Sequence, residues 1–404
     1  MVGAPLPTKE PTRVKGQEMT EPILSESFPY FGEEHTLLRH TIRRFIAEQV
    51  LPVADAWEEQ GFVPREVLLQ MGSLGLLGMR YAPEFGGQGL DTLANAVLAE
   101  ELGRSTYGGF AVTVLVHTDM ASPHLYHAGT RAQLERWMPA ITAGRMITAI
   151  AMTEADAGSD LASMRTTARK IQGGYVLNGA KMFITNGVHG DLVFVAAKSG
   201  APGRNRELTM FAVEKGAAGL RVTRALKKHG WLSSDTAELV FEDCFVPDAN
   251  VLGPEGQGFF ALVKNLQNER IVLAAQALGE AIKAIELTLD WVKERKAFGG
   301  VLWDKQAIRQ RLSMRLGQVE AARALLFNTA WRDTRNENVV REVSMLKALA
   351  GTLVNEVLYD CLQFHGAMGY MRESPIERMA RDARVQAIGG GATEVMLDEV
   401  AKRL

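Results

Sequence analysis

The chain has 404 residues with 45 basic and 47 acidic side chains, which gives a net charge of −2. This even balance argues against a protein that binds nucleic acid or an anionic membrane through charge. Apolar residues make up 47% and charged residues 23%, as in ordinary globular proteins. The length predicts two or three domains at roughly 100–200 residues each. Two cysteines without a CxxC motif exclude a disulfide framework, and no apolar run reaches the roughly 18 residues that span a bilayer.

Residues 1–32 differ in composition from the rest of the chain. They are rich in Pro, Glu, Lys and Thr and contain no apolar core, so they predict a mobile tail rather than a secretory signal. We therefore expect a cytoplasmic protein that does not act on a membrane.

Residues 33–145 are predicted to form an N-terminal helical domain. Apolar residues between Leu37 and Val50 recur at spacings of three and four, which is typical of an amphipathic helix. A glycine-rich loop over 83–89 precedes a further helix near residues 93–101. Gly108 and Gly109 then open a run of small residues, where the lack of bulk would let another group lie close to the backbone.

The pattern changes over residues 146–255. A hairpin is predicted over 173–179, and short apolar runs at 192–197, 208–213, 239–241 and 245–247 are typical of buried strands. Because no helices separate these strands, they indicate an antiparallel β-barrel rather than a doubly wound sheet.

Residues 256–404 return to helical periodicity. Three long apolar stripes, joined by short polar links near 298–300 and 336–338, predict an antiparallel four-helix bundle. The expected fold is therefore an α+β multidomain protein with the order helical, β-barrel, helical.

Several common catalytic motifs are absent from the sequence. There is no P-loop, no GxGxxG between a strand and a helix, no HExxH and no GxSxG. His117, His124 and His127 cluster, but without a metal-binding spacing they are interpreted as surface or core histidines, and no metal site is expected. The turn Gly389–Gly391, before a helix expected near Thr393, is either a simple connection or a place where backbone N–H groups face a ligand.

Glu269 is the most informative acidic residue. It lies on an apolar stripe between Leu266 and Leu273, where a carboxylate loses solvation. Burial disfavours the charged form of a carboxyl group, which suits a general base. An ion pair with Arg270 or with a helix neighbour is the alternative, and the stripe by itself leaves both readings open.

Two segments of the β block combine hydroxyl groups with small residues. Residues 153–160 follow an apolar strand, and Lys181–Gly187 follow the predicted hairpin with an aromatic ring at Phe183. Together they offer the hydroxyl and backbone donors that a polar ring system such as flavin requires, although each alone is also compatible with ordinary turn chemistry.

At this point the chain resembles the acyl-CoA dehydrogenase family, from about Glu33 to Leu404. Several independent motifs occur in the family's order, and the three-block pattern agrees with the family's helical, β-barrel and four-helix-bundle domains. The matching segments are Met152–Asp160, Asn178–Gly187, Asp235–Asp243, Glu294–Gly299, Gln363–Gly366, Gly369–Tyr370 and Arg381–Arg384.

The resemblance implies an FAD enzyme that introduces a trans double bond between the α and β carbons of an acyl-CoA thioester. It also implies that FAD is shared between subunits of a homotetramer and that electrons pass to electron-transfer flavoprotein. Phe183 would cover the flavin ring and Thr185 would bond to its edge. The other residues implied in FAD binding are Met152, Thr153, Gly158, Ser159 and Glu394, and, for the ADP half across the subunit boundary, Arg295, Phe298, Gln306, Gln363 and Gly366.

The resemblance also points to a catalytic base, because members of the family carry this residue at one of two positions. Many members carry a Glu before the last helix, where this chain has Gly390, and a glycine cannot abstract a proton. Long-chain and isovaleryl-type members place the base on the first bundle helix, which matches Glu269. The resemblance therefore implies that Glu269 takes the α proton, while the Gly390 N–H donates to the thioester carbonyl.

The resemblance also suggests how the substrate binds. Arg270 would lie near the CoA moiety, or else form an ion pair on the helix surface, and Ser159, Gly108 and Gly109 would border the substrate. Residues 118–123 resemble those of citronellyl-CoA dehydrogenases, so a long or branched acyl group is expected. Two alternative functions remain. In these, the chain is either a flavin-dependent oxidase or hydroxylase of the same fold, or a non-catalytic assembly partner.

Overall fold

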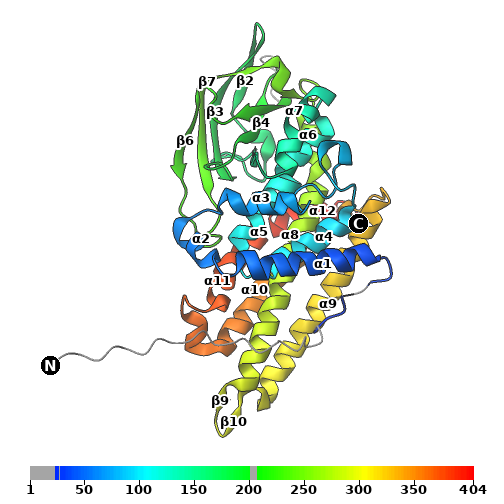
Figure 1. Cartoon of the computed structure of the whole chain (residues 1–404), viewed down its shortest axis with the longest axis vertical. Coiled ribbons are helices and arrows are strands. Elements are labelled where there is room, and N and C mark those ends of the chain that lie inside the picture. The colour runs from blue at the N-terminus through cyan, green and yellow to red at the C-terminus, as the bar shows by residue number, and fades with distance from the viewer. Residues whose placement is uncertain (1–22, 27, 201–206) are drawn as a thin grey trace, which may run out of the picture.

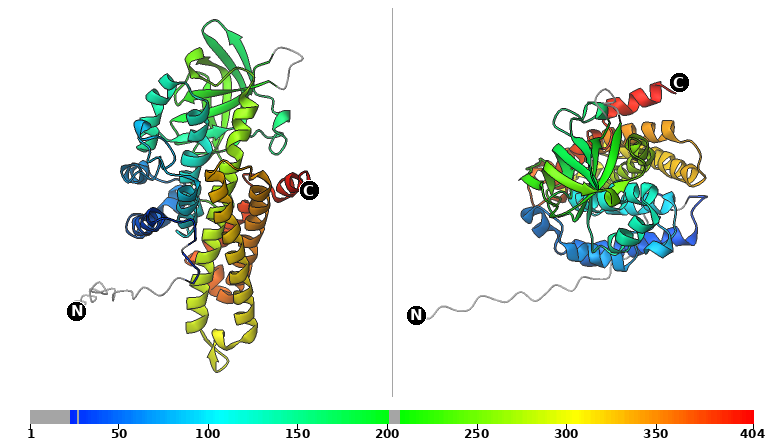
Figure 2. Two further views of the ribbon diagram at one scale, coloured as in Figure 1. Left: turned by 90° about the vertical axis from the view of Figure 1, so that its right-hand side faces the viewer. Right: turned by 90° about the horizontal axis from the view of Figure 1, so that it is seen from above.

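The computed structural model describes residues 23–26, 28–200 and 207–404. Two helical regions flank a β domain, in the predicted order (Figure 1). The long helices of the C-terminal region extend away from the β domain, which lies at the opposite end of the molecule (Figures 1 and 2). Among the described residues, no helix is both long enough and apolar enough to cross a membrane.

The N-terminal segment departs from its prediction. Residues 1–22 and 27, most of the predicted tail, lie outside the described residues. The ring centroid of Phe28 lies 4.7 Å from that of Phe327, and the Tyr30 and Trp331 rings stack at 5.6 Å. The prediction of a mobile tail is therefore wrong for residues 28–32, because their aromatic rings pack on a helix far along the sequence.

Within the described residues, the N-terminal region is built from seven α-helices, a π-helical segment at Ile46–Val50 and the π-helical turn Val116–Ala121. Helix α4 is buried on every side and packs against both α1 and α8. Since residues of this region share one apolar core with the C-terminal helices, the two helical regions form a single packed body. The elements are α1 (Glu33–Phe45), α2 (Ala54–Gln60), α3 (Arg65–Ser73), α4 (Thr92–Gly103), α5 (Gly108–Leu115), the π-helical turn Val116–Ala121, α6 (Ser122–Ala128) and α7 (Arg131–Thr142).

The middle region is one sheet in the order β6-β7-β3-β2-β4-β5-β8, and β1 adds to β4. Most pairs are antiparallel, as predicted, but β1 runs parallel to β4. The described pairings form an open path from β6 to β8 instead of the closed ring of a barrel. The strands are β1 (Thr148–Ala151), β2 (Thr167–Ile171), β3 (Gly174–Thr185), β4 (Leu192–Lys198), β5 (Leu208–Glu214), β6 (Leu220–Ala225), β7 (Thr236–Pro247) and β8 (Val251–Leu252).

The C-terminal region contains three long helices that lie side by side (Figure 2). The predicted fourth helix of the bundle is represented by shorter helices, of which α12 packs on α10. The elements are α8 (Gly258–Glu294), the hairpin of β9 (Lys296–Ala297) and β10 (Gly300–Val301), α9 (Gln306–Thr334), α10 (Val340–His365), α11 (Pro375–Ala383) and α12 (Thr393–Ala401).

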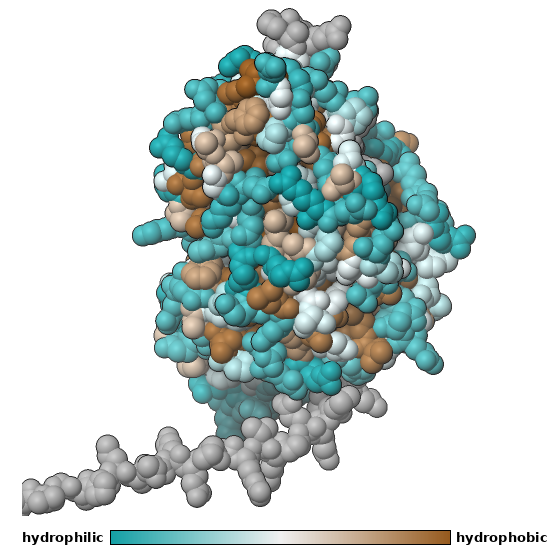
Figure 3. Space-filling view, turned by 45° about the horizontal axis from the view of Figure 1, so that its top comes forward, coloured by the Kyte–Doolittle hydropathy of each residue, from teal (hydrophilic) through white to brown (hydrophobic). Residues whose placement is uncertain are grey.

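Apolar and polar side chains are interspersed over the face of the molecule shown in Figure 3. The two cysteines, Cys244 and Cys361, are buried free thiols. Among the described residues, no group of three or more His, Cys, Asp or Glu side chains is placed to hold a metal ion.

Candidate active site

Helix α8 places Glu269 in the interior, where its exposure is 5%. The side-chain amide of Asn265, one turn earlier, donates a hydrogen bond of 2.9 Å to Oε1 of Glu269. The ring of His124 on α6 approaches the same oxygen, with Nε2 at 3.7 Å. No described side chain donates a hydrogen bond to Oε2. One carboxylate oxygen is therefore held by the protein and the other is free to react.

Asn265 also connects Glu269 to the π-helical turn. Its amide donates a second hydrogen bond, of 2.8 Å, to the backbone carbonyl of Asp119, and Asn268 donates to that carbonyl at 3.0 Å. Because Asp119 is fully enclosed, burial raises the pKa of its carboxyl group, while hydrogen bonds from Thr118 and others counteract this effect. These hydrogen bonds therefore hold the π-helical turn against α8 next to Glu269.

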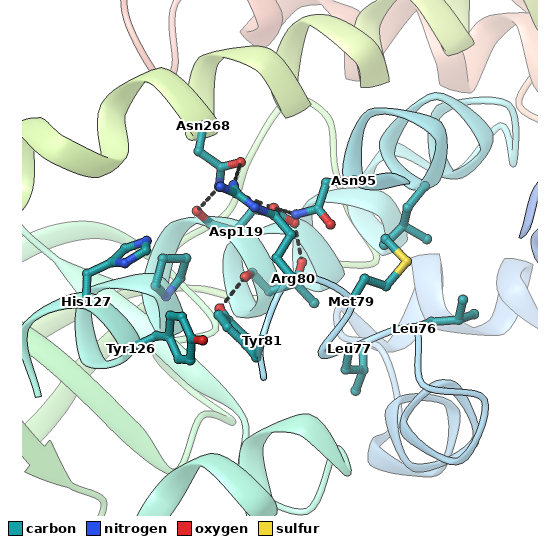
Figure 4. Close-up of a pocket in the computed structure, with 13 residues that line it drawn as sticks. Leu76, Leu77, Met79, Arg80, Tyr81, Asn95, Asp119, Tyr126, His127 and Asn268 are labelled. Carbon is teal, nitrogen blue, oxygen red and sulfur yellow. Dashed lines mark hydrogen bonds between the residues drawn. The ribbon is translucent and has the colours of Figure 1, made fainter. Parts of the chain in front are cut away.

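A small pocket lies on the far side of this network (Figure 4). Arg80 projects into it and donates a hydrogen bond to the Asn268 side chain, and Asn95 on α4 donates to the Asp119 carboxylate. Apolar side chains complete the lining, which includes Leu76, Leu77, Met79, Leu98, Pro123 and Tyr126.

The predicted glycine turn before the last helix is confirmed, since α12 begins at Thr393. Gly390 has a φ of +62°, and a Cβ atom at this position would lie 2.1 Å from Cδ1 of Leu273 on α8. Lys347 on α10 holds the turn by donating hydrogen bonds to the carbonyls of Gln386 (2.6 Å) and Gly391 (3.3 Å). Burial lowers the pKa of Lys347 to about 8. Gly390 therefore lies against α8, one turn beyond Glu269.

Arg270 faces the same turn. A Cβ atom on Gly391 would lie 3.5 Å from its Nε, which is buried and has no hydrogen-bond partner among the residues that the structure describes. Burial lowers the pKa of this guanidinium, and the nearby Glu269 charge counteracts the effect. Within the described part of the chain, Arg270 forms no ion pair, so the helix-surface ion pair, one of its two sequence interpretations, has no support.

The loop after β1 is anchored by a buried ion pair. Lys181 Nζ lies 2.8 Å from Glu154 Oε1 and donates to the Met152 carbonyl at 2.9 Å. The backbone N–H of Met182 donates to the Thr153 carbonyl. These contacts fix the backbone of the loop and leave Thr153 half-buried, with Gly158 and Ser159 exposed.

Phe183 stands out from β3 beside this loop. The register between β3 and β7 shifts between Lys181 and Ile184, and Phe183 at that irregularity has a φ of +63°. Its side chain is 60% exposed, which is unusual for a phenylalanine. Thr185, two residues later, ends the strand half-buried. The structure therefore leaves the Phe183 ring uncovered, and its contact with a flavin stays a prediction.

A second group of predicted cofactor residues lies on the β9–β10 hairpin, at the start of α9 and at the end of α10, and the hairpin lies at the end of the long helices that points away from the β domain (Figure 1). Phe298 is 92% exposed at the tip of the β9–β10 hairpin, with a φ of +52°. This group comprises Arg295, Phe298, Gln306, Gln363 and Gly366, all exposed. One chain alone therefore does not bring the two predicted halves of the cofactor site together. Glu394 is exposed in the first turn of α12, after the glycine turn.

Gly108 and Gly109 are buried at the start of α5. A Cβ atom on Gly108 would lie 2.6 Å from the indole nitrogen of Trp231, and one on Gly109 would lie 2.5 Å from the Ser233 hydroxyl. The close approach that these small residues were predicted to permit is therefore made by the chain's own loop, and their contact with substrate stays a prediction.

His124 and Asn265 were missed as functional residues by the sequence analysis. His124 was interpreted as an ordinary surface or core histidine, because no motif connects it with Glu269. Asn265 carried a detectable signal, since residues four apart on a helix are neighbours and its amide is able to reach a carboxylate at position 269.

Comparison with known proteins adds an independent line of information. Family models for the N-terminal, middle and C-terminal domains of acyl-CoA dehydrogenases match residues 32–145, 149–244 and 256–404. The mitochondrial long-chain specific acyl-CoA dehydrogenase of Mus musculus is 39% identical over 376 residues, covering 93% of this chain and 87% of that protein.

Solved structures show the same similarity. An acyl-CoA dehydrogenase from Geobacillus kaustophilus superposes with a TM-score of 0.90 at 36% identity, covering 93% of this chain and 99% of the other. A structure titled as the FAD complex of PigA has a TM-score of 0.88 at 25% identity and covers 93% and 98% of the two chains.

Proposed function

The chain belongs to the acyl-CoA dehydrogenase family of oxidoreductases, which act on CH–CH bonds, and on this basis we propose that it uses FAD to oxidise long or branched acyl-CoA thioesters. The product is the trans-2-enoyl-CoA. The observation that carries this proposal is the Glu269 carboxylate, which is buried on α8 with one oxygen tethered and the other free.

The residues of the middle domain fit a flavin. Phe183 exposes an aromatic face, and the anchored loop at Thr153–Ser159 offers hydroxyl and backbone donors next to it. When bound there, FAD supplies a hydride acceptor at its N5 atom. Thr153, Thr185 and Ser159 would orient the ring through hydrogen bonds, and Phe183 would shield it from water.

Glu269 acts as the general base in this proposal. Its Oε2 removes the α proton of the acyl group, and the Gly390 N–H stabilises the negative charge that develops on the thioester oxygen. Arg270, next to the glycine turn, would contact the CoA portion. Lys347 contributes by holding the turn in place.

The cofactor residues at the tip of the bundle require a second chain. Because the β9–β10 hairpin points away from the β domain that carries Phe183 (Figure 1), we propose that Arg295, Phe298 and Gln363 bind the ADP half of an FAD seated mainly in a neighbouring subunit of a homotetramer. Sedimentation of the yellow protein tests this assembly, and Phe298→Ala is expected to lower FAD content while leaving each chain folded.

The preference for long or branched acyl groups rests on similarity to the long-chain enzyme of Mus musculus and on residues 118–123. The experiment is anaerobic bleaching of the purified protein with straight, branched and aromatic acyl-CoAs. Bleaching by long or branched thioesters is expected. Bleaching by short straight chains alone would contradict the substrate class, and no bleaching by any thioester would contradict dehydrogenation itself.

Two companion measurements complete this test. Glu269→Gln is expected to bind FAD and acyl-CoA but to remain yellow. We expect a cytoplasmic dehydrogenase, whose reduced flavin is re-oxidised rapidly by electron-transfer flavoprotein and only slowly by oxygen. Rapid re-oxidation by oxygen would instead indicate the oxidase or hydroxylase alternative.

A further inference from the structure

His124 is a buried histidine without a hydrogen-bond partner. Its exposure is 2%, and neither Nδ1 nor Nε2 has a partner among the described residues. A buried polar group left in this state costs roughly 1–3 kcal/mol, so its presence calls for an explanation. The nearest charged group is Glu269, with His124 Nε2 3.7 Å from its Oε1.

Asn265 supplies the second contact with the same oxygen. Its exposure is 3%, and its two N–H bonds point to two acceptors, the Asp119 carbonyl and Glu269 Oε1. Since an amide nitrogen has two hydrogens, both contacts are made at once. Asn265 therefore fixes Glu269 relative to the π-helical turn as well as to its own helix.

We propose that His124 and Asn265 are positioning residues that hold Oε1 of Glu269 so that Oε2 faces the α carbon of the substrate. This inference rests on the proposed role of Glu269 as the base. The 3.7 Å separation is longer than a hydrogen bond, and a change of less than one ångström on substrate binding brings Nε2–H within donating distance, as catalytic contacts commonly tighten in the complex.

The charged groups around Glu269 come from several elements. Arg270 lies next to it on α8, His124 faces it from α6, and the Asp119 carboxylate lies behind Asn265. Two further charges lie next to these groups and not next to Glu269 itself: Lys347 on α10 is near Arg270, and Arg80 is near Asp119. Removing the Asn265 amide leaves all of these charges in place and deletes two hydrogen bonds, one to Glu269 Oε1 and one to the Asp119 carbonyl, so the second bond needs its own control.

The first test replaces Asn265 by Leu, which keeps the size and removes the donor. A hydrogen bond to a charged group is worth roughly 1.5–3 kcal/mol, so the acidic limb of the kcat–pH profile is expected to move upward by about one unit. The rate at a pH on that limb would fall roughly tenfold, while the dissociation constant of a non-reacting acyl-CoA thioether stays unchanged.

The second test compares two variants of His124. His124→Leu is expected to lower kcat about threefold to tenfold, and His124→Gln, which restores a donor near the Nε2 position, is expected to recover most of it. If Leu and Gln behave alike, packing at this site and not the donor controls the rate, and the role of His124 is rejected.

Asn268→Leu is the matched control for Asn265. Asn268 is buried on the same helix and donates to the same Asp119 carbonyl, and among the described residues no hydrogen bond joins its side chain to that of Glu269. Its substitution is expected to lower the melting temperature without moving the pH profile. A shift as large as that of Asn265→Leu would overturn the positioning role, as would an unchanged profile in Asn265→Leu.

Glu269→Gln, measured in parallel, separates the two proposals. If that variant still bleaches with acyl-CoA, the proposed function fails first. If it is inactive while the Asn265 and His124 variants behave like the wild type, only the positioning inference fails.

Discussion

Glu269 and Glu280 lie about three turns apart on α8, and both are nearly inaccessible to solvent, with exposures of 5% and 2%. Their surroundings differ. Glu269 accepts a hydrogen bond from Asn265 through Oε1, whereas Oε1 of Glu280 accepts two, from Gln276 at 2.8 Å and from Gln386 at 3.2 Å. Oε2 of Glu280 is buried and has no hydrogen-bond partner in the described part of the chain. Burial raises the pKa of Glu280 to about 8.

The comparison shows that burial alone does not identify a catalytic base. Burial raises the pKa of Glu280 to about 8, so this carboxyl group is largely protonated near pH 7 and cannot accept a proton in that form. A base must also reach the proton that it removes. The buried Oε2 of Glu280 lacks that access, and Glu269 lies beside Arg270 and Leu273, which face the glycine turn.

The largest expected difference is in activity. Glu269→Gln is expected to reduce the rate of flavin bleaching by about 10²–10⁴-fold, the usual contribution of general-base catalysis. Glu280→Gln keeps the hydrogen-bonding shape of the protonated acid, so its rate is expected to stay close to that of the wild type. Stopped-flow absorbance under anaerobic conditions measures both, and a large loss in Glu280→Gln would reverse the assignment.

The second difference is in the pH dependence of stability. Because the folded-state pKa of Glu280 lies above its unfolded value, the folded protein binds the extra proton between about pH 4.5 and pH 8, and stability decreases as pH rises through this range. Glu280→Gln cannot ionise and avoids this loss. Its melting temperature relative to the wild type is therefore expected to increase from pH 5 to pH 8. If the melting temperatures of Glu280→Gln and the wild type differ by the same amount at pH 5 and at pH 8, this result would contradict a buried Glu280 that ionises in this range.

The smallest effect concerns the glycine turn that packs on α8 between the two acids. Gly390→Ala places a Cβ atom against Leu273 at a left-handed φ, which is expected to cost about 1–2 kcal/mol. The matched control is Gly389→Ala, since a Cβ there meets its nearest atom at 3.6 Å without a positive φ. Thermal unfolding of the two variants measures the difference in stability. Equal melting temperatures would show that the turn accommodates the added Cβ atom without strain.

Much of the fold was predictable because its signals are local. The short apolar runs at 192–197 and 208–213 became β4 and β5, and the glycine turn before Thr393 lies where its composition indicated. The two short runs at 239–241 and 245–247 are parts of one strand, β7. Asp243 between them has a φ of +45°, a backbone irregularity that the sequence pattern interprets as a break.

The candidate site was less accessible to sequence reasoning. The apolar stripe on α8 nominated Glu269 but left an ion pair as an alternative, and the same logic applied equally to Glu280. The meeting of Glu269 with His124 joins two segments far apart in the chain. Such a contact depends on how α6 packs against α8, which hydrophobic periodicity does not encode.

The sequence by itself determined the order of the three regions, the family and the helix that carries the proposed base, because periodicity and motifs are properties of neighbouring residues. Only the tertiary structure decided that Glu269 keeps a free carboxylate oxygen while Glu280 is sealed, and that Gly108 and Gly109 are covered by Trp231 and Ser233. These outcomes depend on which surfaces are brought together when distant segments pack, and access to solvent or substrate is settled at that step.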